Sequence, residues 1–261
     1  MPNWCNNSIN ISGDDESIKK LLIEAKSEES DFTLNNLIPI PKEQEEDWYN
    51  WRVSNWGTKW DIGKVEIEIN EGNASFNCET AWAPPNEALQ KISEKYPTLT
   101  FEMFYEEPGM DFCGKVVYQN GEALEDVSTS YSENFNTLIN FEKEKATIEN
   151  GIVKVPCTLS KKEDPYDFDA PHKTVHGTLE FSFDLEPDDF ESSICGDEKE
   201  ISFVMSNEED NDFVEQCINE NAYDVAQTIE DEFDEIKTTA NYNYLNQSVP
   251  ENGSNKKRKK L

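Results

Sequence analysis

The chain has 261 residues, of which 55 are acidic and 23 are basic, and its formal net charge at pH 7 is −32. A surface with this charge repels nucleic acid and anionic membranes and attracts basic partners. No stretch approaches the roughly 18 consecutive apolar residues of a membrane helix, and the first residues carry no recognisable targeting signal. We therefore expect a cytoplasmic protein that does not associate with a membrane.

The charge is distributed unevenly along the chain. Residues 1–120 contain 22 acids and 10 bases, residues 121–255 contain 33 acids and 8 bases, and the last six residues, KKRKKL, contain five bases. This predicts three parts: a domain over 1–120, an acidic α+β region over 121–240, and a disordered tail over 241–261 with a basic end.

The first part alternates between strands and helices. Apolar and polar residues alternate at 7–12, which predicts a strand, and a helix with apolar residues at i, i+3, i+4 and i+7 follows a capping Asp14 or Asp15. A second helix begins at Pro84 and Pro85. Further strands are predicted at 65–70, 74–80, 99–105 and 112–118. This order predicts an α+β fold, a ferredoxin-like (split βαβ) sandwich with one added strand and a tryptophan-rich insertion.

The pattern changes after residue 121. Three short apolar runs separated by acidic turns predict strands at 152–159, 178–185 and 200–205. Residues 213–236 place apolar side chains at helical spacing, with a dense Asp and Glu outer face, which predicts one amphipathic helix or two.

The tryptophan-rich insertion, WYNWRVSNWGTKWD at 48–61, contains four of the six tryptophans. We expect a short helical turn over 48–52, and then a turn at Gly57 that folds Trp56 and Trp60 back onto the sheet. Trp4 and Trp82 would meet them there in a small core. The alternative is a shallow pocket beside the TAWAPP loop for a small polar ligand or a peptide. Its candidate residues are Trp48, Trp51, Arg52, Lys59, Asp61 and Trp82.

Residues of recognisable catalytic chemistry are scarce. His172 and His176 have the i, i+4 spacing of helical metal ligands, but Pro171 and Gly177 flank them and a strand follows. The six cysteines form no CxxC pair, so we expect reduced thiols. We predict no catalytic residue, no metal and no cofactor, and favour a non-catalytic protein over an enzyme of unrecognised type.

Five sequence motifs occur in a characteristic order. They are MPNWCNN at the start, LIPIP at 37–41, the tryptophan-rich insertion at 48–61, TAWAPP at 80–85, and YEEPGMDFCG at 105–114. Together they resemble the Api92-like, or YubB-like, family over about residues 1–120. The resemblance implies a ferredoxin-like domain and a setting in plasmids, phages and genomic islands, and hence in the cytoplasm of a bacterial host. It implies no enzymatic activity.

The acidic region predicts a surface for a basic protein partner, encoded by the host or by the mobile element. Closely spaced carboxylates can also imitate the charge line of duplex DNA, which suggests a DNA-mimic or counter-defence role. The candidate residues are Asp188, Asp189, Glu191, Glu230, Asp231, Glu232, Asp234 and Glu235. Nucleic acid is disfavoured as a ligand of this surface. Base stacking on the tryptophan-rich insertion, in a small-ligand or nucleic-acid-binding module, remains an alternative.

Overall fold

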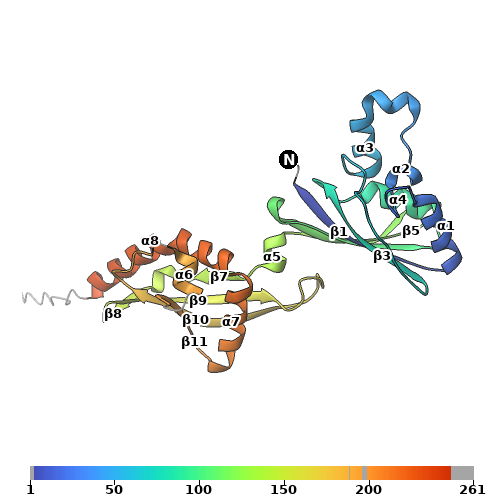
Figure 1. Ribbon diagram of the computed structural model, residues 1–261. Coiled ribbons are helices and arrows are strands. Elements are labelled where there is room, and N and C mark those ends of the chain that lie inside the picture. The colour runs from blue at the N-terminus through green and yellow to red at the C-terminus, as the bar shows by residue number, and fades with distance from the viewer. Residues whose placement is uncertain (1–2, 188, 196–198, 248–261) are drawn as a thin grey trace, which may run out of the picture. The chain divides into compact units, whose positions relative to one another are not determined.

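The computed structural model describes residues 3–187, 189–195 and 199–247 (Figure 1). The chain divides into two compact units, each with its own hydrophobic core. The first unit is Met1–Asn134 with Pro165–Phe168. The second is Phe135–Asp164 with the chain from Asp169 onward. Within the described ranges, no helix is long and apolar enough to cross a membrane.

The first unit is built on a six-stranded antiparallel sheet with the order β2-β3-β1-β4-β5-β6. Its strands are β1 (Trp4–Ser12), β2 (Glu68–Asn70), β3 (Asn73–Ala81), β4 (Thr100–Glu107), β5 (Phe112–Gln119) and β6 (Glu122–Thr129). Its helices are α1 (Asp15–Ala25), α2 (Leu34–Leu37), α3 (Trp48–Trp56), α4 (Asn86–Lys95) and α5 (Tyr131–Phe135), with 3₁₀ turns η1 (Lys42–Asp47) and η2 (Pro108–Met110).

Two helical crossover connections, each of which skips one strand, make this sheet ferredoxin-like. The chain passes from β1 through α1 to β2, and β3 lies between those two strands. It passes from β3 through α4 to β4, and β1 lies between them. The predicted fold class is therefore confirmed.

The sheet has two added strands where the sequence predicted one. Asn120 and Gly121 both have positive φ, 50° and 80°, and form the two-residue turn that suits a tight hairpin. They return the chain as β6, which pairs with β5. The first unit consequently continues to Asn134 rather than ending near residue 120.

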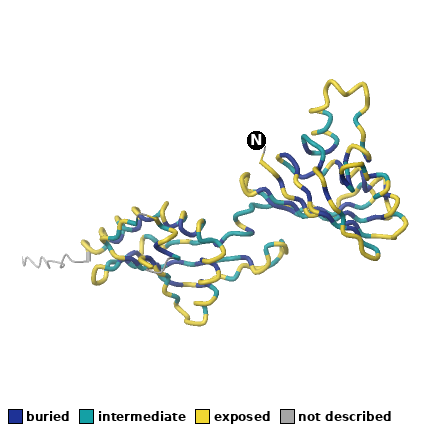
Figure 2. The backbone as a smooth tube through the Cα atoms, viewed as in Figure 1, coloured by how far each residue is buried: buried dark blue, intermediate teal, exposed yellow. Residues whose placement is uncertain are grey.

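Helices cover one face of this sheet (Figure 1). The carboxylate of Asp14 caps α1 by accepting the Ser17 N–H at 2.8 Å, as predicted. Ile18 and Leu21 of α1 belong to the same hydrophobic core as Ile9 and Phe101 of the strands. Burial of such side chains contributes roughly 1.5–3 kcal/mol each. Figure 2 shows the buried residues along the strands and the exposed ones in the loops.

The predicted strand at 65–70 is wrong over its first half, since β2 begins only at Glu68. Val65 is buried although it does not pair with β3 as part of the sheet. Its N–H donates to Ser30 Oγ at 3.1 Å, and its carbonyl accepts the Asp31 N–H at 3.3 Å. A period-2 apolar pattern does not distinguish this packing from a strand.

The second unit has a five-stranded antiparallel sheet in the order β11-β10-β9-β7, with β8 also paired to β9. Its strands are β7 (Leu138–Phe141), β8 (Thr147–Glu149), β9 (Ile152–Lys162), β10 (His172–Ser182) and β11 (Ile201–Met205). Its helices are α6 (Phe190–Cys195), α7 (Asn211–Glu220) and α8 (Ala222–Gln247), with 3₁₀ turns η3 (Lys143–Lys145) and η4 (Glu208–Asp210).

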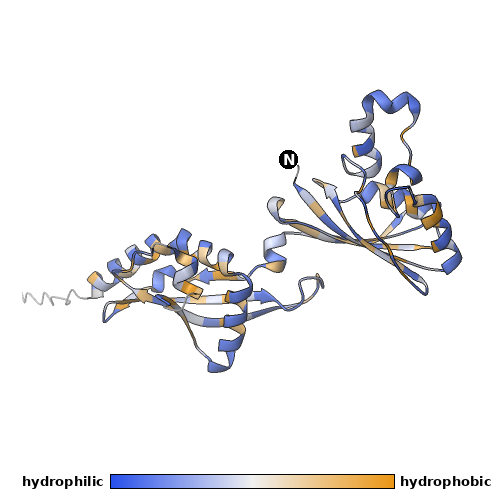
Figure 3. Ribbon diagram, viewed as in Figure 1, coloured by the Kyte–Doolittle hydropathy of each residue, from blue (hydrophilic) through white to orange (hydrophobic). Residues whose placement is uncertain are grey.

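Helix α8 provides much of the second core. Val225, Ile229 and Phe233 are buried, and the Phe233 ring centroid lies 4.6 Å from that of Phe181 on β10. Hydrophobic and hydrophilic residues alternate along α8 in Figure 3. The segment predicted as helical at 213–236 contains two helices, because the helical conformation is interrupted at Asn221, between α7 and α8.

The predicted disorder from residue 241 is wrong for 241–247, which continue α8. Ala240 is fully buried, and the Asn243 side chain donates to the carbonyl of Ala146 at 2.9 Å. These contacts extend the helix past the point where the sequence becomes polar. The rest of the predicted tail, with the basic KKRKKL end, lies outside the described residues.

Gly57 ends α3 in the left-handed conformation, with φ 82°, and provides a stability prediction. A Cβ there would lie 2.1 Å from Glu87 Oε2 and 2.9 Å from the Pro84 carbonyl oxygen. We expect Gly57→Ala to lower the free energy of unfolding by at least about 1 kcal/mol. Gly63→Ala, which meets nothing within 4 Å, is the matched control and should leave it unchanged or slightly raised. Urea unfolding measures both; equal midpoints would contradict the prediction.

Candidate functional site

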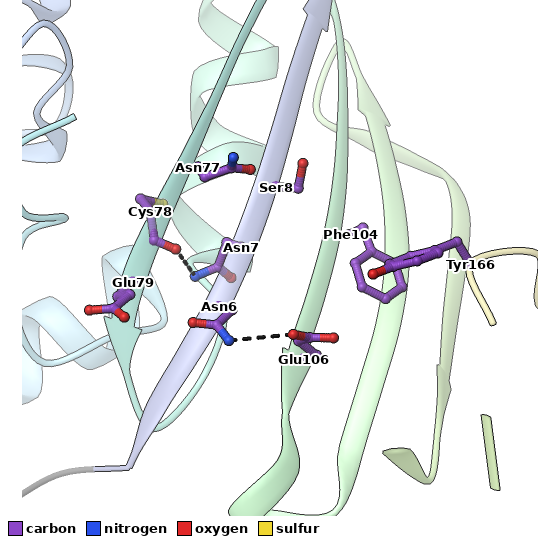
Figure 4. Close-up of a pocket in the computed structure, with 9 residues that line it drawn as sticks. All are labelled: Asn6, Asn7, Ser8, Asn77, Cys78, Glu79, Phe104, Glu106 and Tyr166. Atoms are coloured by element: carbon purple, nitrogen blue, oxygen red, sulfur yellow. Dashed lines mark hydrogen bonds between the residues drawn. The ribbon is translucent and has the colours of Figure 1, made fainter. Parts of the chain in front are cut away.

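A pocket of about 620 Å³ lies on the face of the first sheet opposite the helices (Figure 4). It is formed by three adjacent strands, β3, β1 and β4, and by one residue of the segment Pro165–Phe168. Its lining residues are Asn6, Asn7, Ser8, Asn77, Cys78, Glu79, Phe104, Glu106 and Tyr166.

Strand register arranges the pocket in two rows. In the first row, Asn6 of β1 pairs with Glu79 of β3 on one side and with Glu106 of β4 on the other. In the second row, Ser8 lies between Asn77 and Phe104. Because alternate residues of a strand point to opposite faces, both rows project away from the helices.

Asn7 belongs to the other side of the pleat and holds the strands together beneath the pocket. Only 3% of Asn7 is exposed. Its Nδ2 donates to Thr80 Oγ1 and to the Cys5 carbonyl, both at 2.9 Å, and to the Cys78 carbonyl at 3.3 Å. These bonds satisfy a buried amide and fix β1 against β3.

The pocket lining carries two carboxylates and no basic group. Asn6 Nδ2 donates to Glu106 Oε1 at 3.4 Å. Lys115 is the cross-strand neighbour of Phe104, but its ammonium pairs with Glu102 at 3.0 Å and Glu125 at 3.1 Å. Hydrogen bonds to those two carboxylates raise the pKa of Lys115, so its charge is engaged outside the pocket.

An aromatic wall closes one side of the pocket. The ring centroid of Phe104 lies 4.9 Å from that of Tyr166 and 5.9 Å from that of Phe168. None of the pocket residues is among the site residues predicted from the sequence. Polar residues alternate with Ile9 and Ile11 along β1, but an ordinary solvated sheet face has the same pattern, so the pattern alone does not mark a pocket.

The tryptophan-rich insertion forms a full helix, α3, instead of the predicted short turn. Trp56 is completely buried, and its indole Nε1 donates to the Ile38 carbonyl at 3.1 Å. Trp51 packs edge-on against it, with ring centroids 5.9 Å apart. Trp48 is 38% exposed. Trp56 is thus folded into the core, as predicted.

Trp60 takes part in a more open cluster. It is only partly buried, and its ring lies 5.8 Å from that of Trp4. Trp4 is 44% exposed and Trp82 is 41% exposed. Trp82 has φ 71°, the left-handed conformation. The ammonium of Lys59 lies 4.6 Å from the Trp60 ring centroid and 5.0 Å from that of Trp82.

The six predicted ligand residues, five in the insertion and Trp82 in the TAWAPP loop, are divided between separate contacts. The guanidinium of Arg52 lies 5.2 Å from the Trp48 ring and 4.7 Å from the Trp56 ring, and Lys59 contacts Trp82 as described above. The carboxylate of Asp61 accepts the backbone N–H groups of residues 34 and 35, at 2.8 and 3.0 Å, at the start of α2. Burial raises the pKa of Asp61, against the effect of these hydrogen bonds.

The predicted acidic residues fall into three groups. Asp188 lies outside the described residues. Asp189 and Glu191 are at the start of α6, and hydrogen bonding to Ser192 lowers the pKa of Asp189. The other five are on α8. There Glu232 and Glu235 pair with Lys143, whereas Glu230, Asp231 and Asp234 are exposed.

The thiols and imidazoles do not form a reactive group in the described ranges. Burial raises the pKa values of Cys5, Cys78 and Cys157 to about 12. His172 and His176 lie on the exposed side of strand β10, not on a helix. Across the part of the chain that the structure describes, no cluster of three or more His, Cys, Asp or Glu side chains could hold a metal ion.

Comparison with known proteins concerns mainly the first unit. Residues 55–149 match the family model described as the ferredoxin-like domain in Api92-like protein. Over 80 residues the chain is 28% identical to YubB of Escherichia coli strain K12; this covers 30% of the chain and 54% of YubB, so the chain spans about half the length of that relative. The crystal structure of Api92 from Yersinia pseudotuberculosis aligns with 50% of the chain and 99% of its own, at 9% identity and a TM-score of 0.39.

The split βαβ sheet and the family-model match define the first unit as a ferredoxin-like domain. The matches of this domain support the resemblance to the Api92-like, YubB-like family that its motifs predicted. The matched region begins inside α3 and ends at residue 149, so it extends past the predicted limit near 120.

Trp56 and Trp48 differ in burial on the same helix and provide a second stability prediction. We expect Trp56→Ala to cost about 3–5 kcal/mol, because it leaves a cavity in the core. Trp48→Ala, the control, removes a partly exposed ring and should cost about 1 kcal/mol or less. Chemical denaturation followed by circular dichroism measures both. Comparable losses would show that the insertion is not clamped by Trp56.

The thiol pKa values predict an order of alkylation. A pKa of about 12 leaves roughly one thiol in ten thousand ionised at pH 8, and only the thiolate is nucleophilic. Cys195 is only half-buried, so it should react first with iodoacetamide in the native protein. Peptide mass spectrometry locates the adduct, and unfolding in urea should expose all six cysteines. Rapid native labelling of Cys5, Cys78 or Cys157 would contradict the assignment.

Proposed function

We propose that this chain is a non-catalytic binding protein that takes a basic protein partner on the outward side of helix α8. The observation that carries the proposal is the charge of that helix: it contains six acidic residues and one basic residue. The base, Lys237, donates to the Leu185 carbonyl at 2.9 Å. Its ammonium is therefore held at a backbone oxygen rather than at the carboxylates.

The acids of α8 repel one another in the free protein. Glu230 and Asp234 are four residues apart, as are Asp231 and Glu235. Each like-charge pair at this spacing costs roughly 0.2–0.5 kcal/mol. Lys143 relieves part of this repulsion by bridging Glu232 and Glu235. A partner with exposed lysines or arginines would supply further cations in the same way.

The finer proposal is a DNA-mimic or counter-defence role for a mobile genetic element in the bacterial cytoplasm. Three carboxylates that form no ion pair among the described residues, Glu230, Asp231 and Asp234, span four helical rises, or about 6 Å at ~1.5 Å per residue. This density is close to the one charge per roughly 1.7 Å of duplex DNA. The chain resembles a family that is typical of phages and plasmids, which supports the assignment to a mobile genetic element.

Co-purification tests the proposal. The full-length tagged chain is incubated with host lysate at low salt, beside the variant Glu230→Gln/Asp231→Asn/Asp234→Asn. The control, Glu43→Gln/Glu45→Gln/Glu46→Gln, neutralises three exposed acids of η1 in the first unit. We expect the α8 variant alone to lose the basic partner, and 0.5 M salt to release it from the wild type, since exposed charges are screened beyond ~10 Å at 0.1 M. If the α8 variant still captures the partner and 0.5 M salt does not release it, α8 is not the binding surface.

DNA competition tests the finer role. If α8 imitates DNA, duplex DNA and this chain should exclude one another from the captured partner in a mobility-shift titration. A ternary complex of partner, DNA and chain would exclude mimicry and leave basic-protein binding intact.

A further inference from the structure

The pocket on the first sheet has a charge that its own surroundings do not neutralise. Glu79 and Glu106 project from β3 and β4 on either side of Asn6 (Figure 4). Among the described residues, neither carboxylate forms an ion pair with a lysine, arginine or histidine. The structure thus presents two anionic groups at the rim of one hollow.

The spacing of these carboxylates suits a cation held between them. Neighbouring strands lie about 4.8 Å apart, so residues two strands apart have Cα atoms about 10 Å apart. A guanidinium group can donate to a carboxylate on each side through charge-assisted hydrogen bonds of about 2.8 Å. Flexible Glu side chains can lean inward to close the remaining distance.

The next row provides an aromatic surface. Phe104 lies beside Ser8 and contacts Tyr166, which is 60% exposed. A planar cation over an aromatic face is attracted by the negative charge density of the ring face. Arginine combines five donors in a rigid fork with a flat face that stacks on rings, whereas the compact ammonium of lysine does not.

We propose that this pocket binds an arginine side chain of a basic protein partner, with Glu79 and Glu106 as its hydrogen-bond acceptors and Phe104 as its stacking surface. The proposal rests on the proposed function only in taking the partner to be basic. It concerns the first unit, whereas the α8 surface belongs to the second. Amides and rings also suit a neutral sugar or amide, but such a ligand would leave the two carboxylates without counter-charges.

A peptide titration of the full-length chain tests the pocket directly. The probe is Gly-Arg-Gly blocked at both ends, and the matched ligand replaces arginine with citrulline, which has nearly the same shape and no charge. Backbone amide shifts are followed by NMR at about 50 mM salt. We expect the arginine peptide to shift amides of β1, β3 and β4 at the pocket, and the citrulline peptide to shift none.

The variants are Glu79→Gln, Glu106→Gln and the control Glu43→Gln, which removes one exposed charge in the insertion of the same unit. We expect each pocket variant to weaken arginine binding at least tenfold and the control to change it less than twofold, with melting temperatures unchanged. Equal binding of citrulline, or equal effects of all three variants, would overturn the proposal. Shifts confined to α8 would also overturn it, while leaving the proposed function standing.

Discussion

The pairing of β1 on both of its edges is the constraint on which the first unit depends. β1 is in register with β3 from Trp4 to Ser12 and with β4 from Asn6 to Ser12. Its pleat sends Ile9 and Ile11 into the core under the helices, and sends Asn6 and Ser8 to the open face. A shift of one residue would exchange these two sets. The same register therefore determines both the hydrophobic core and the pocket.

Much of this architecture could be predicted from local patterns. The Asp14 cap, the period-3.6 face of α1 and the alternation of β1 are signals within short segments, and they indicated the correct elements. The Asn120–Gly121 turn is an equally local signal for the β5–β6 hairpin, but it lies where the charge density rises and the composition predicts a domain boundary. Composition gave the wrong limit there, because a sheet can gain an edge strand whose residues are polar.

The candidate sites could be predicted less well, because they depend on contacts between distant segments. Glu79 and Glu106 come together only through their shared neighbour Asn6, and nothing within either strand indicates that adjacency. In the insertion, spacing predicted a buried Trp56 but could not separate it from Trp60. Trp56 is fully buried, and its indole N–H donates to the Ile38 carbonyl, 18 residues away in the chain.

The acidic composition has different physical consequences in the two units. On α8, Glu230, Asp231 and Asp234 are exposed to solvent, so salt screens them and their field acts mainly at long range. In the pocket, Glu106 is partly enclosed between strands and Asn6 donates to it. A cation there would be held by directed hydrogen bonds, which depend on geometry more than on ionic strength. A net charge of −32 therefore does not describe one kind of surface; strand register and helix packing decide which carboxylates face open solvent and which line a pocket.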